Sequence, residues 1–401
     1  MRLPSTPRPE TAEISRTEPR FRRSARQLSV ALVLLLVLTR VPRASAHGGT
    51  HSSGLTQWHA VLVVLGGVAA VVGSVLLKRR GRLAPTTALY GVLFGLIAAG
   101  LGTVLWEGLA SDPTYTAQTM PFPRSWYRPL SLVVGLAVAV ASLVLGLLRW
   151  PTRPRYTFLG ILMGLWVSYP ELVPGPGSYT HPLGYAVVLA TPVLVGYVVW
   201  TDAGDVLASV LRDPVARRFG LGVGLVVALF FMATSGFVTF FWEEGAPHET
   251  TVEVLPAAYQ LVQWPTLEVA LPEIPLFFAF SAGIAVVVGT LGGLVGLNAA
   301  LIARQWRLGE RAGMAEGTAG TGVVVGSCTC GCCGPLVAKV AVLAAGPSVA
   351  APIYWVFVDT ASPLSSLFII ASVVLFTGSL VYSVESARRL GGQSSASVAA
   401  D

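Results

Sequence analysis

Charged residues are scarce in this chain: Asp, Glu, Lys and Arg together make up 12% of its 401 residues, and lysine occurs only twice. Hydrophobic residues make up 53%, and the mean hydropathy is +0.68. This composition excludes a soluble globular domain, a disordered chain and a coiled coil. Cysteine is also scarce, and all four cysteines lie within residues 328–333, which excludes a secreted disulfide scaffold. The sequence therefore predicts an integral membrane protein.

The sequence motifs of several common enzyme classes are absent as well. The chain contains no nucleotide-binding loop, no C-x-x-C-H haem attachment and no H-E-x-x-H zinc signature. It also has no recognisable serine–histidine–acid arrangement. A pump that hydrolyses its own ATP is therefore not expected, and the sequence favours a protein that is not an enzyme.

The formal net charge of +7 does not indicate a nucleic-acid-binding protein. Residues 1–46 carry nine arginines and three glutamates, a net charge of +6, which leaves about +1 for residues 47–401. Because no basic face remains after residue 46, nucleic acid is not an expected partner.

Residues 1–46 have the three parts of a secretory signal peptide. Basic residues extend to Arg26, an apolar run follows at 28–38, and the small residues of a cleavage site end at Ala46. The apolar run is too short to cross a bilayer comfortably. Cleavage after Ala46 would make His47 the new N-terminus, and the alternative is an anchor that is not cleaved.

The rest of the chain is predicted to be an all-α, polytopic membrane helix bundle over residues 47–389, followed by a disordered cytoplasmic tail over 390–401. Apolar runs close to the ~20 residues needed to cross a bilayer give about nine spans. They lie near 57–77, 86–109, 129–148, 156–172, 183–200, 219–241, 276–302, 320–346 and 362–384.

The distribution of arginine and lysine orients these spans. Fifteen cations fall in the connections on one side, and only Arg124 and Arg128 fall on the other. The positive-inside rule then places the N-terminus outside and the C-terminus in the cytoplasm of a multi-pass cell-membrane protein. The fifteen are Lys78, Arg79, Arg80, Arg82, Arg149, Arg153, Arg155, Arg212, Arg217, Arg218, Arg304, Arg307, Arg311, Arg388 and Arg389.

Two smaller patterns concern packing and the surface. Glycines four residues apart, at 91 and 95, at 289 and 293, and at 292 and 296, predict closely packed spans. The charged segment 201–218 is interpreted as a short cytoplasmic surface helix whose charges face solvent.

The histidines indicate a metal site on the outer side of the membrane. In the predicted topology all five lie at or beyond the outer boundary, together with carboxylates such as Glu253 and Glu268. Imidazole beside carboxylate on a negative surface suits a divalent transition-metal cation. The five candidate ligands are His47, His51, His59, His181 and His248.

His47 is the most specific of these ligands if the signal peptide is removed. Its free α-amine and its imidazole could then chelate one ion together. This arrangement is similar to the N-terminal histidine of periplasmic copper carriers and copper monooxygenases, in which a second histidine completes the site. The resemblance covers His47 and one further histidine, and it implies copper; those families present the site on a β-sandwich domain, which is not expected in this chain.

The cysteine run provides a second candidate metal site, within the predicted span 320–346. Counting about 1.5 Å per residue from the start of that span places the run near the bilayer midplane. Thiolates at this density favour Cu(I) or Zn(II), although thiol–disulfide chemistry and structural packing are alternatives. Pro335 and nearby glycines disfavour a continuous helix, and a broken helix at membrane depth often marks a binding site. The four candidate ligands are Cys328, Cys330, Cys332 and Cys333.

Lys339 and Asp359 form a predicted ion pair within the membrane. A charge at this depth is costly unless it is paired or reaches the interface. The pair could be structural, or it could belong to a proton or ion path.

These observations give one leading hypothesis and two alternatives. The leading hypothesis is a membrane protein that takes a transition-metal ion, copper or else zinc, at an outer histidine–carboxylate site and then transports or delivers it through the cysteines. The first alternative is a membrane thiol–disulfide oxidoreductase. The second is a noncatalytic subunit of a membrane assembly that docks a membrane or extracytoplasmic protein through 242–275, with an apolar surface at Tyr259, Leu261, Val262 and Trp264.

Overall fold

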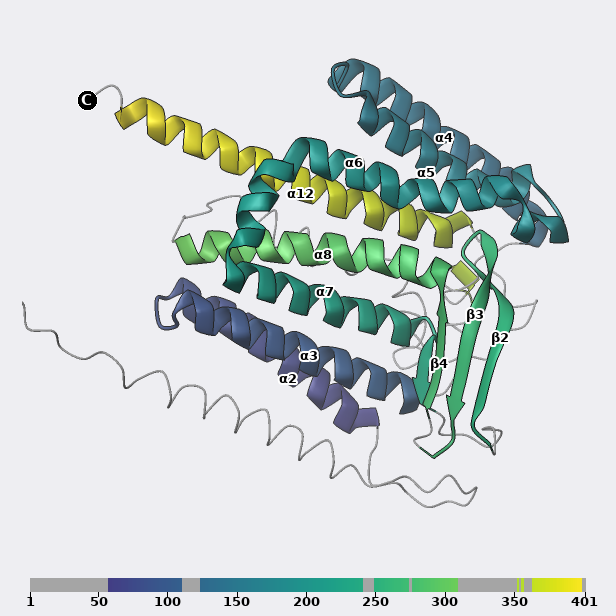
Figure 1. Ribbon diagram of the computed structural model, residues 1–401, viewed down its shortest axis with the longest axis horizontal. Coiled ribbons are helices and arrows are strands. Elements are labelled where there is room, and N and C mark those ends of the chain that lie inside the picture. Colours follow the sequence, from purple (N-terminus) through teal and green to yellow (C-terminus); the bar gives the residue numbers. More distant parts are fainter. Residues whose placement is uncertain are drawn as a thin grey trace, which may run out of the picture. The chain divides into compact units, whose positions relative to one another are not determined.

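The computed structural model describes residues 57–109, 123–240, 249–273, 276–308, 352, 355–356 and 363–398. All of them belong to one unit that begins at residue 54. Eight α-helices, two short 3₁₀ helices (Arg124–Trp126 and Pro176–Thr180) and one four-stranded sheet are present in the described part of the chain (Figure 1). The helices are α2 Gln57–Arg79, α3 Pro85–Leu109, α4 Tyr127–Arg149, α5 Pro154–Leu172, α6 Pro182–Arg212, α7 Pro214–Thr234, α8 Ala282–Leu308 and α12 Pro363–Val398.

Seven of these helices are long and apolar enough to cross a membrane, which supports the predicted multi-pass bundle. They correspond to seven of the nine predicted spans. The eighth helix, α5, matches the predicted span 156–172 in position, but Arg155, Pro170 and Glu171 make it less apolar than the others. The remaining predicted span, 320–346, lies outside the described residues, as does the predicted signal peptide.

Proline sets many of the helix boundaries. Five helices (α3, α5, α6, α7 and α12) begin with proline, whose missing N–H would have no partner in the first turn of a helix anyway. Between α6 and α7, the Asp213 carboxylate also accepts a hydrogen bond from the N–H of Val215 at 2.9 Å. The prediction of one short helix over 201–218 is therefore wrong, because α6 continues to Arg212 and a new helix starts at Pro214. At the other end of the chain, α12 continues to Val398 into the predicted tail, a stretch that contains no helix-breaking proline.

The all-α prediction is incomplete, because the chain between α7 and α8 forms an antiparallel sheet. Its strands are β1 Val238–Phe240, β2 Thr251–Tyr259, β3 Val262–Leu271 and β4 Leu276–Ser281, in the spatial order β1-β4-β3-β2. A two-residue turn at Gln260, whose φ is 58°, joins β2 to β3. Strands β1 and β4 occupy the ends of the apolar runs predicted as spans 219–241 and 276–302.

Hydropathy could not separate strand from helix in these two runs, since both are apolar throughout. The sequence nevertheless contained a capping signal at the boundary between β4 and α8. The Ser281 hydroxyl accepts a hydrogen bond from the N–H of Ile284 at 3.3 Å, as an N-cap residue does, and α8 begins at the next residue, Ala282.

The sheet packs against the end of the helix bundle through β3. The Trp264 indole lies against Gly283, where any side chain would overlap it, and meets the Tyr185 ring edge-on at 5.1 Å. The Tyr185 hydroxyl donates to the Gln263 carbonyl. Val262 occupies the equivalent place beside Gly184 of α6.

This packing corrects the predicted docking surface. Leu261, Val262 and Trp264 are 6%, 0% and 8% exposed, and Tyr259 packs edge-on against Phe237 at 4.9 Å. Leu261, Val262 and Trp264 belong to the core of the protein, and Tyr259 is partly buried against it. They do not form the exposed surface that a partner protein would need.

Helix α8 lies at the centre of the bundle and α2 and α4 lie at its periphery. In the apolar window of α8, 67% of residues are buried, whereas the share is 17% in α2 and in α4. The exposed side chains of α2 and α4 are mainly leucine and valine. Surfaces of this kind suit contact with lipid.

Glycines allow α7 and α8 to approach closely. Gly220 and Gly224 of α7 face Gly296 and Gly292 of α8, and a Cβ at Gly296 would lie 2.8 Å from the carbonyl oxygen of Gly220. The predicted role of Gly292 and Gly296 is therefore confirmed, and so is that of Gly91 and Gly95, which pack against α2. Gly289 and Gly293 differ: within the described chain, no atom lies within 4 Å of a Cβ at either position.

The variants Gly296→Ala and Gly289→Ala are expected to differ in their effect on stability. Gly296→Ala should destabilise the protein by about 1–3 kcal/mol, because the added methyl overlaps the α7 backbone. Gly289→Ala on the same helix should be neutral or stabilising by about 0.5–1 kcal/mol, because alanine restricts the unfolded chain more than glycine does. Thermal unfolding in detergent measures both; equal effects would contradict the assigned interface.

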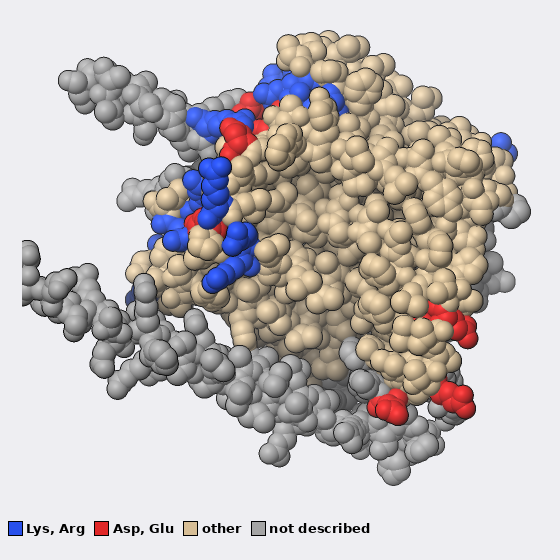
Figure 2. All heavy atoms as spheres, viewed as in Figure 1, with Lys and Arg blue, Asp and Glu red and all other residues tan. Residues whose placement is uncertain are grey.

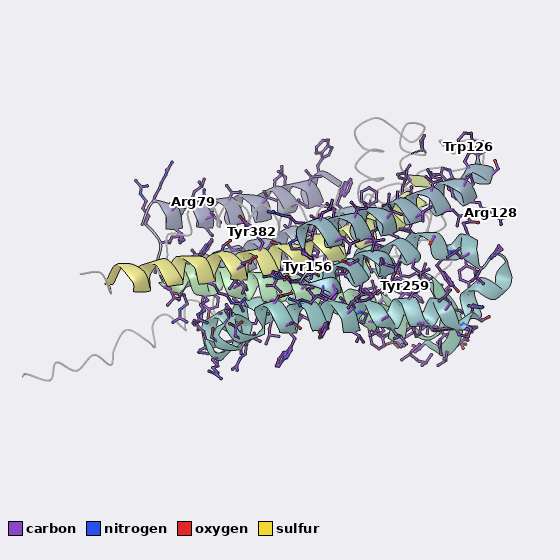
Figure 3. The ribbon with its side chains drawn as sticks, turned by 90° about the horizontal axis from the view of Figure 1, so that it is seen from above. Arg79, Trp126, Arg128, Tyr156, Tyr259 and Tyr382 are labelled. Carbon is purple, nitrogen blue, oxygen red and sulfur yellow. The ribbon has the colours of Figure 1, made fainter. Side chains whose placement is uncertain are left out.

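The two ends of the bundle differ in charge. Most of the described cations gather at the end of the bundle where α6 joins α7, which we call the basic end (Figure 2). The described acidic residues that lie outside the basic end gather near the sheet, at the end that we call the sheet end. Arg79 lies at the basic end and Arg128 at the opposite end (Figure 3). The one-sided distribution of cations predicted from the sequence is therefore present in the fold.

Candidate functional site

Most of the predicted metal ligands lie outside the described residues, and so do Lys339 and Asp359 of the predicted ion pair. The ligands concerned are His47, His51, His248, Cys328, Cys330, Cys332 and Cys333. Only His59 and His181 are described. Within the described ranges, no three His, Cys, Asp or Glu side chains come close enough together to hold a metal ion.

The two described histidines have different surroundings. His59 is exposed in the first turn of α2. His181 is the N-cap residue of α6, and its Nδ1 accepts a hydrogen bond from the N–H of Leu183 at 3.2 Å. A neutral imidazole with Nδ1 as acceptor carries its proton on Nε2, so metal binding by His181 would have to displace either the cap or that proton.

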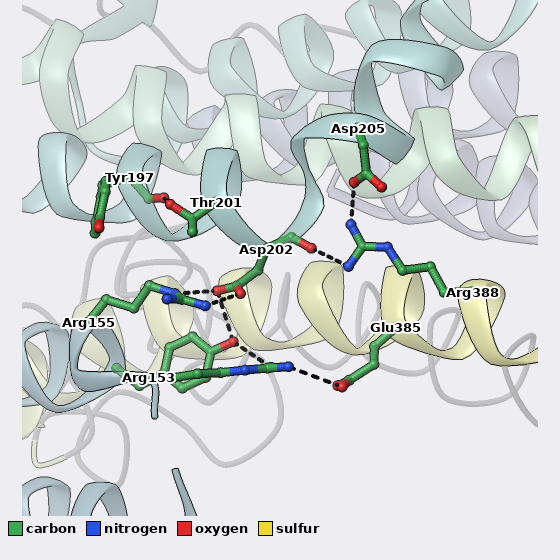
Figure 4. A network of polar contacts seen from close by, with 9 residues as sticks. Arg153, Arg155, Tyr197, Thr201, Asp202, Asp205, Glu385 and Arg388 are labelled. Carbon is green, nitrogen blue, oxygen red and sulfur yellow. Dashed lines mark hydrogen bonds and ion pairs between the residues drawn. The ribbon is translucent and has the colours of Figure 1, made fainter. Parts of the chain in front are cut away.

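The best-defined polar site of the described chain lies at the basic end, between α5, α6 and α12 (Figure 4). Two N–H groups of Arg155 donate to the two oxygens of the Asp202 carboxylate, with Nε 2.7 Å from Oδ2. The Tyr156 hydroxyl donates to the same Oδ2 at 2.9 Å. Asp202 is 8% exposed, so this carboxylate is buried and held by three hydrogen bonds.

Arg388 and Arg153 connect this centre to α12. Arg388 donates to the backbone carbonyl of Asp202 at 2.9 Å and pairs with the exposed Asp205. Arg153 donates to the Tyr156 hydroxyl at 3.2 Å and to Glu385 of α12 at 3.4 Å. The hydrogen bond to Tyr156 raises the pKa of Arg153 above its ordinary value, against the opposing effect of burial, so this guanidinium stays charged.

Further contacts at the basic end extend the polar network to α8, the central helix. Arg304 and Arg307 near the end of α8 donate to Ser209 of α6 and to Asp213. The ammonium of Lys78 lies 4.5 Å from the centre of the Trp306 ring. The cations of the basic end therefore also hold neighbouring helix ends together.

The burial of Asp202 was not predicted from the sequence, which suggested that the charges of 201–218 face solvent. A signal was available in the predicted topology. That topology places the connection containing Arg155 on the same side as the end of the 183–200 span, so an arginine could reach an acidic residue just past that span. The prediction that the charges of this segment face solvent is therefore wrong for Asp202 but holds for Asp205, which is exposed.

A large groove lies beside this network, between α4, α5 and α12. Its volume is about 1220 Å³. Most of its lining is apolar, with side chains such as Val138, Leu367 and Val374, while Arg149, Arg153 and Glu385 line it at the basic end. The arrangement can hold an elongated apolar group that ends in an anion.

No protein-family model, no curated protein and no solved structure matches the chain.

Proposed function

We propose that this multi-pass membrane protein binds a transition-metal ion, copper in preference to zinc, and transports it or delivers it to another protein of the cell membrane. Cys328, Cys330, Cys332 and Cys333 form the inner site, and histidines with carboxylates form an outer site. The observation that carries the proposal is the density of soft ligands. Four thiols within six residues exceed what packing requires and match the preference of Cu(I) and Zn(II).

The directions of α8 and α12 support a membrane location for the cysteines. Helix α8 starts at the sheet and ends at the basic end, where Arg307 pairs with Asp213. Helix α12 runs parallel to it: Asn298 of α8 donates to the carbonyl of Phe376 at 3.2 Å, and Arg388 reaches Asp205 at the basic end.

Two parallel helices in sequence require a connection that returns between their opposite ends. Helix α8 has 27 residues and therefore a length of roughly 40 Å. Residues 309–362 have to cover this distance from the basic end to the sheet end. The predicted span 320–346, with the cysteine run near its middle, lies in this connection and is long enough to make one crossing.

The sheet supports an outer site that attracts cations. In the β2–β3 register, Glu253 lies directly opposite Glu268. Like charges at such a cross-strand position are unfavourable unless a cation or solvent separates them. Together with His59 and the histidines at 47, 51 and 248, these carboxylates supply the donor types of the proposed outer site.

The charges of the two ends set the orientation. We assign the basic end to the cytoplasm by the positive-inside rule, which leaves the acidic sheet on the outer side. A cation would then meet carboxylate and imidazole first and thiolate second. The donors become softer along this path, which suits an ion that is bound as Cu(I) in the membrane.

Maleimide labelling tests the proposal against the thiol–disulfide alternative. We expect a membrane-impermeant maleimide to label the cysteines of right-side-out vesicles slowly, and bound Cu(I) to block labelling by a permeant maleimide. Thiolates that coordinate a metal within the membrane are neither accessible nor free to react. Rapid labelling from outside that Cu(I) does not affect would favour redox exchange and contradict the metal site.

A further inference from the structure

The groove between α4, α5 and α12 has a polarity gradient along its length. Helix α12 lines it from Leu364 to Glu385, which is roughly 30 Å at 1.5 Å per residue. Apolar side chains of all three helices make up most of this length. The cations Arg149 and Arg153 occur only at its basic end.

Cations outnumber carboxylates among the described residues that line that end of the groove. Arg153 is paired with Glu385 at 3.4 Å, while Arg149, also a lining residue, is exposed at the last position of α4. Its described lining therefore contains two cations and one carboxylate. Trp150 lies between them in sequence and packs edge-on against Tyr156 at 5.7 Å, so an aromatic pair also lines this end.

One buried polar atom in the groove lacks a hydrogen bond. Thr377 lines the groove and is 3% exposed; its hydroxyl oxygen is enclosed by protein and has no hydrogen-bond partner among the described residues. Leaving a buried hydroxyl unsatisfied costs about 1–3 kcal/mol. Thr377 lies eight residues before Glu385 on α12, about 12 Å deeper than the cationic end.

We propose that this groove binds one anionic phospholipid, with its phosphate at Arg149 and Arg153 and its acyl chains along α12. Basic pockets between transmembrane helices at the cytoplasmic side bind anionic lipid headgroups, and a volume of 1220 Å³ accommodates a ligand of lipid size. A free phosphate would leave the apolar length of the groove empty, so the proposal commits to the lipid.

Native mass spectrometry of the full-length protein tests the headgroup contacts. Protein is reconstituted with phosphatidylcholine and phosphatidylglycerol, extracted, and stripped with increasing detergent. Wild-type protein is expected to retain one phosphatidylglycerol after the other lipids are lost. Arg149→Gln combined with Arg153→Gln should reduce retention at least tenfold, and Arg149→Gln alone, at an exposed position, should reduce it without affecting the fold.

Two control variants separate lipid binding from the ion pair. Glu385→Gln removes the same ion pair as Arg153→Gln but keeps the cation, so retention should be unchanged or higher. Arg217→Gln with Arg218→Gln lowers the charge of the basic end outside the groove lining and should also leave retention unchanged. Equal loss in Glu385→Gln and Arg153→Gln, or equal retention of phosphatidylcholine and phosphatidylglycerol, would overturn the proposal.

Photo-crosslinking identifies the occupant of the apolar part. Benzoylphenylalanine at Val374, a lining position that is 45% exposed, is expected to give a phospholipid adduct in the membrane. A crosslink to residues 309–362 would show that the chain itself fills the groove, and a crosslink between two chains would show an oligomer interface. Either result would overturn the lipid assignment.

Discussion

Replacing Cys328, Cys330, Cys332 and Cys333 with serine is expected to lower tight metal binding from near-stoichiometric to background. Serine keeps the approximate size and polarity of cysteine, but its oxygen is a hard and weakly acidic donor that Cu(I) and Zn(II) do not favour. The variant should keep its fold, because serine fits the space of cysteine and the described helices pack closely on one another, as α7 does on α8. Elemental analysis after dialysis against a competing chelator measures the loss, and circular dichroism checks the fold.

Double variants locate the ligands within the run. In a helix, Cys328 and Cys332 share one face, and Cys330 and Cys333 share a neighbouring face. The pair that holds the metal should lose it when changed to serine, and the other pair should retain most of it. Full metal content in the quadruple variant would show that the thiolate site is wrong, whatever the histidines bind.

The variant Asp202→Ala is expected to produce the largest loss of stability among single substitutions at the basic end. Removing one partner of a buried ion pair leaves the other charge unpaired, which costs about 3–5 kcal/mol. Here the stranded group is Arg155, whose side chain is 16% exposed, and Tyr156 loses its acceptor as well. Thermal unfolding in detergent should show a correspondingly lower transition temperature.

Asp205→Ala provides the matched control for Asp202→Ala. Asp205 lies on the same helix and pairs with Arg388, but the two side chains are 67% and 43% exposed. Exposed ion pairs contribute less than about 1 kcal/mol, so this variant should unfold close to the wild-type temperature. Similar losses in the two variants would mean that burial does not distinguish the two aspartates.

The helices were predictable because apolar length is a strong signal in a membrane protein. Seven predicted spans correspond to apolar helices of the fold, and the one-sided cations gather at one end. Both features follow from the cost of placing charge and unpaired backbone groups in lipid, which depends on composition alone. The spacing of glycines predicted close packing in α8 as well, but it did not distinguish Gly292 and Gly296, which face α7, from Gly289 and Gly293.

The sheet was harder to predict, because its strands border the helices without a break in hydropathy. Phe277 and Phe278 of β4 extend the apolar run of α8, so a search by length joins them to the span. The pairing of Glu253 with Glu268 depends on register, which no single strand determines. Ser281 was the available boundary signal.

The polar network and the groove depend on tertiary packing. Asp202 and Arg155 are 47 residues apart and meet only when α5 packs beside α6. Gly289 and Gly292 are equivalent in the sequence pattern, and the rotation of α8 decides which of them faces α7. The groove arises from how three helices splay, which hydropathy does not report.

The most direct test of the metal-binding proposal is the elemental metal content per polypeptide of the detergent-purified protein, with the N-terminus sequenced on the same sample. The proposal predicts near-stoichiometric copper or zinc and a chain that begins at His47. Metal-free protein that also fails to bind added Cu(I) would contradict it.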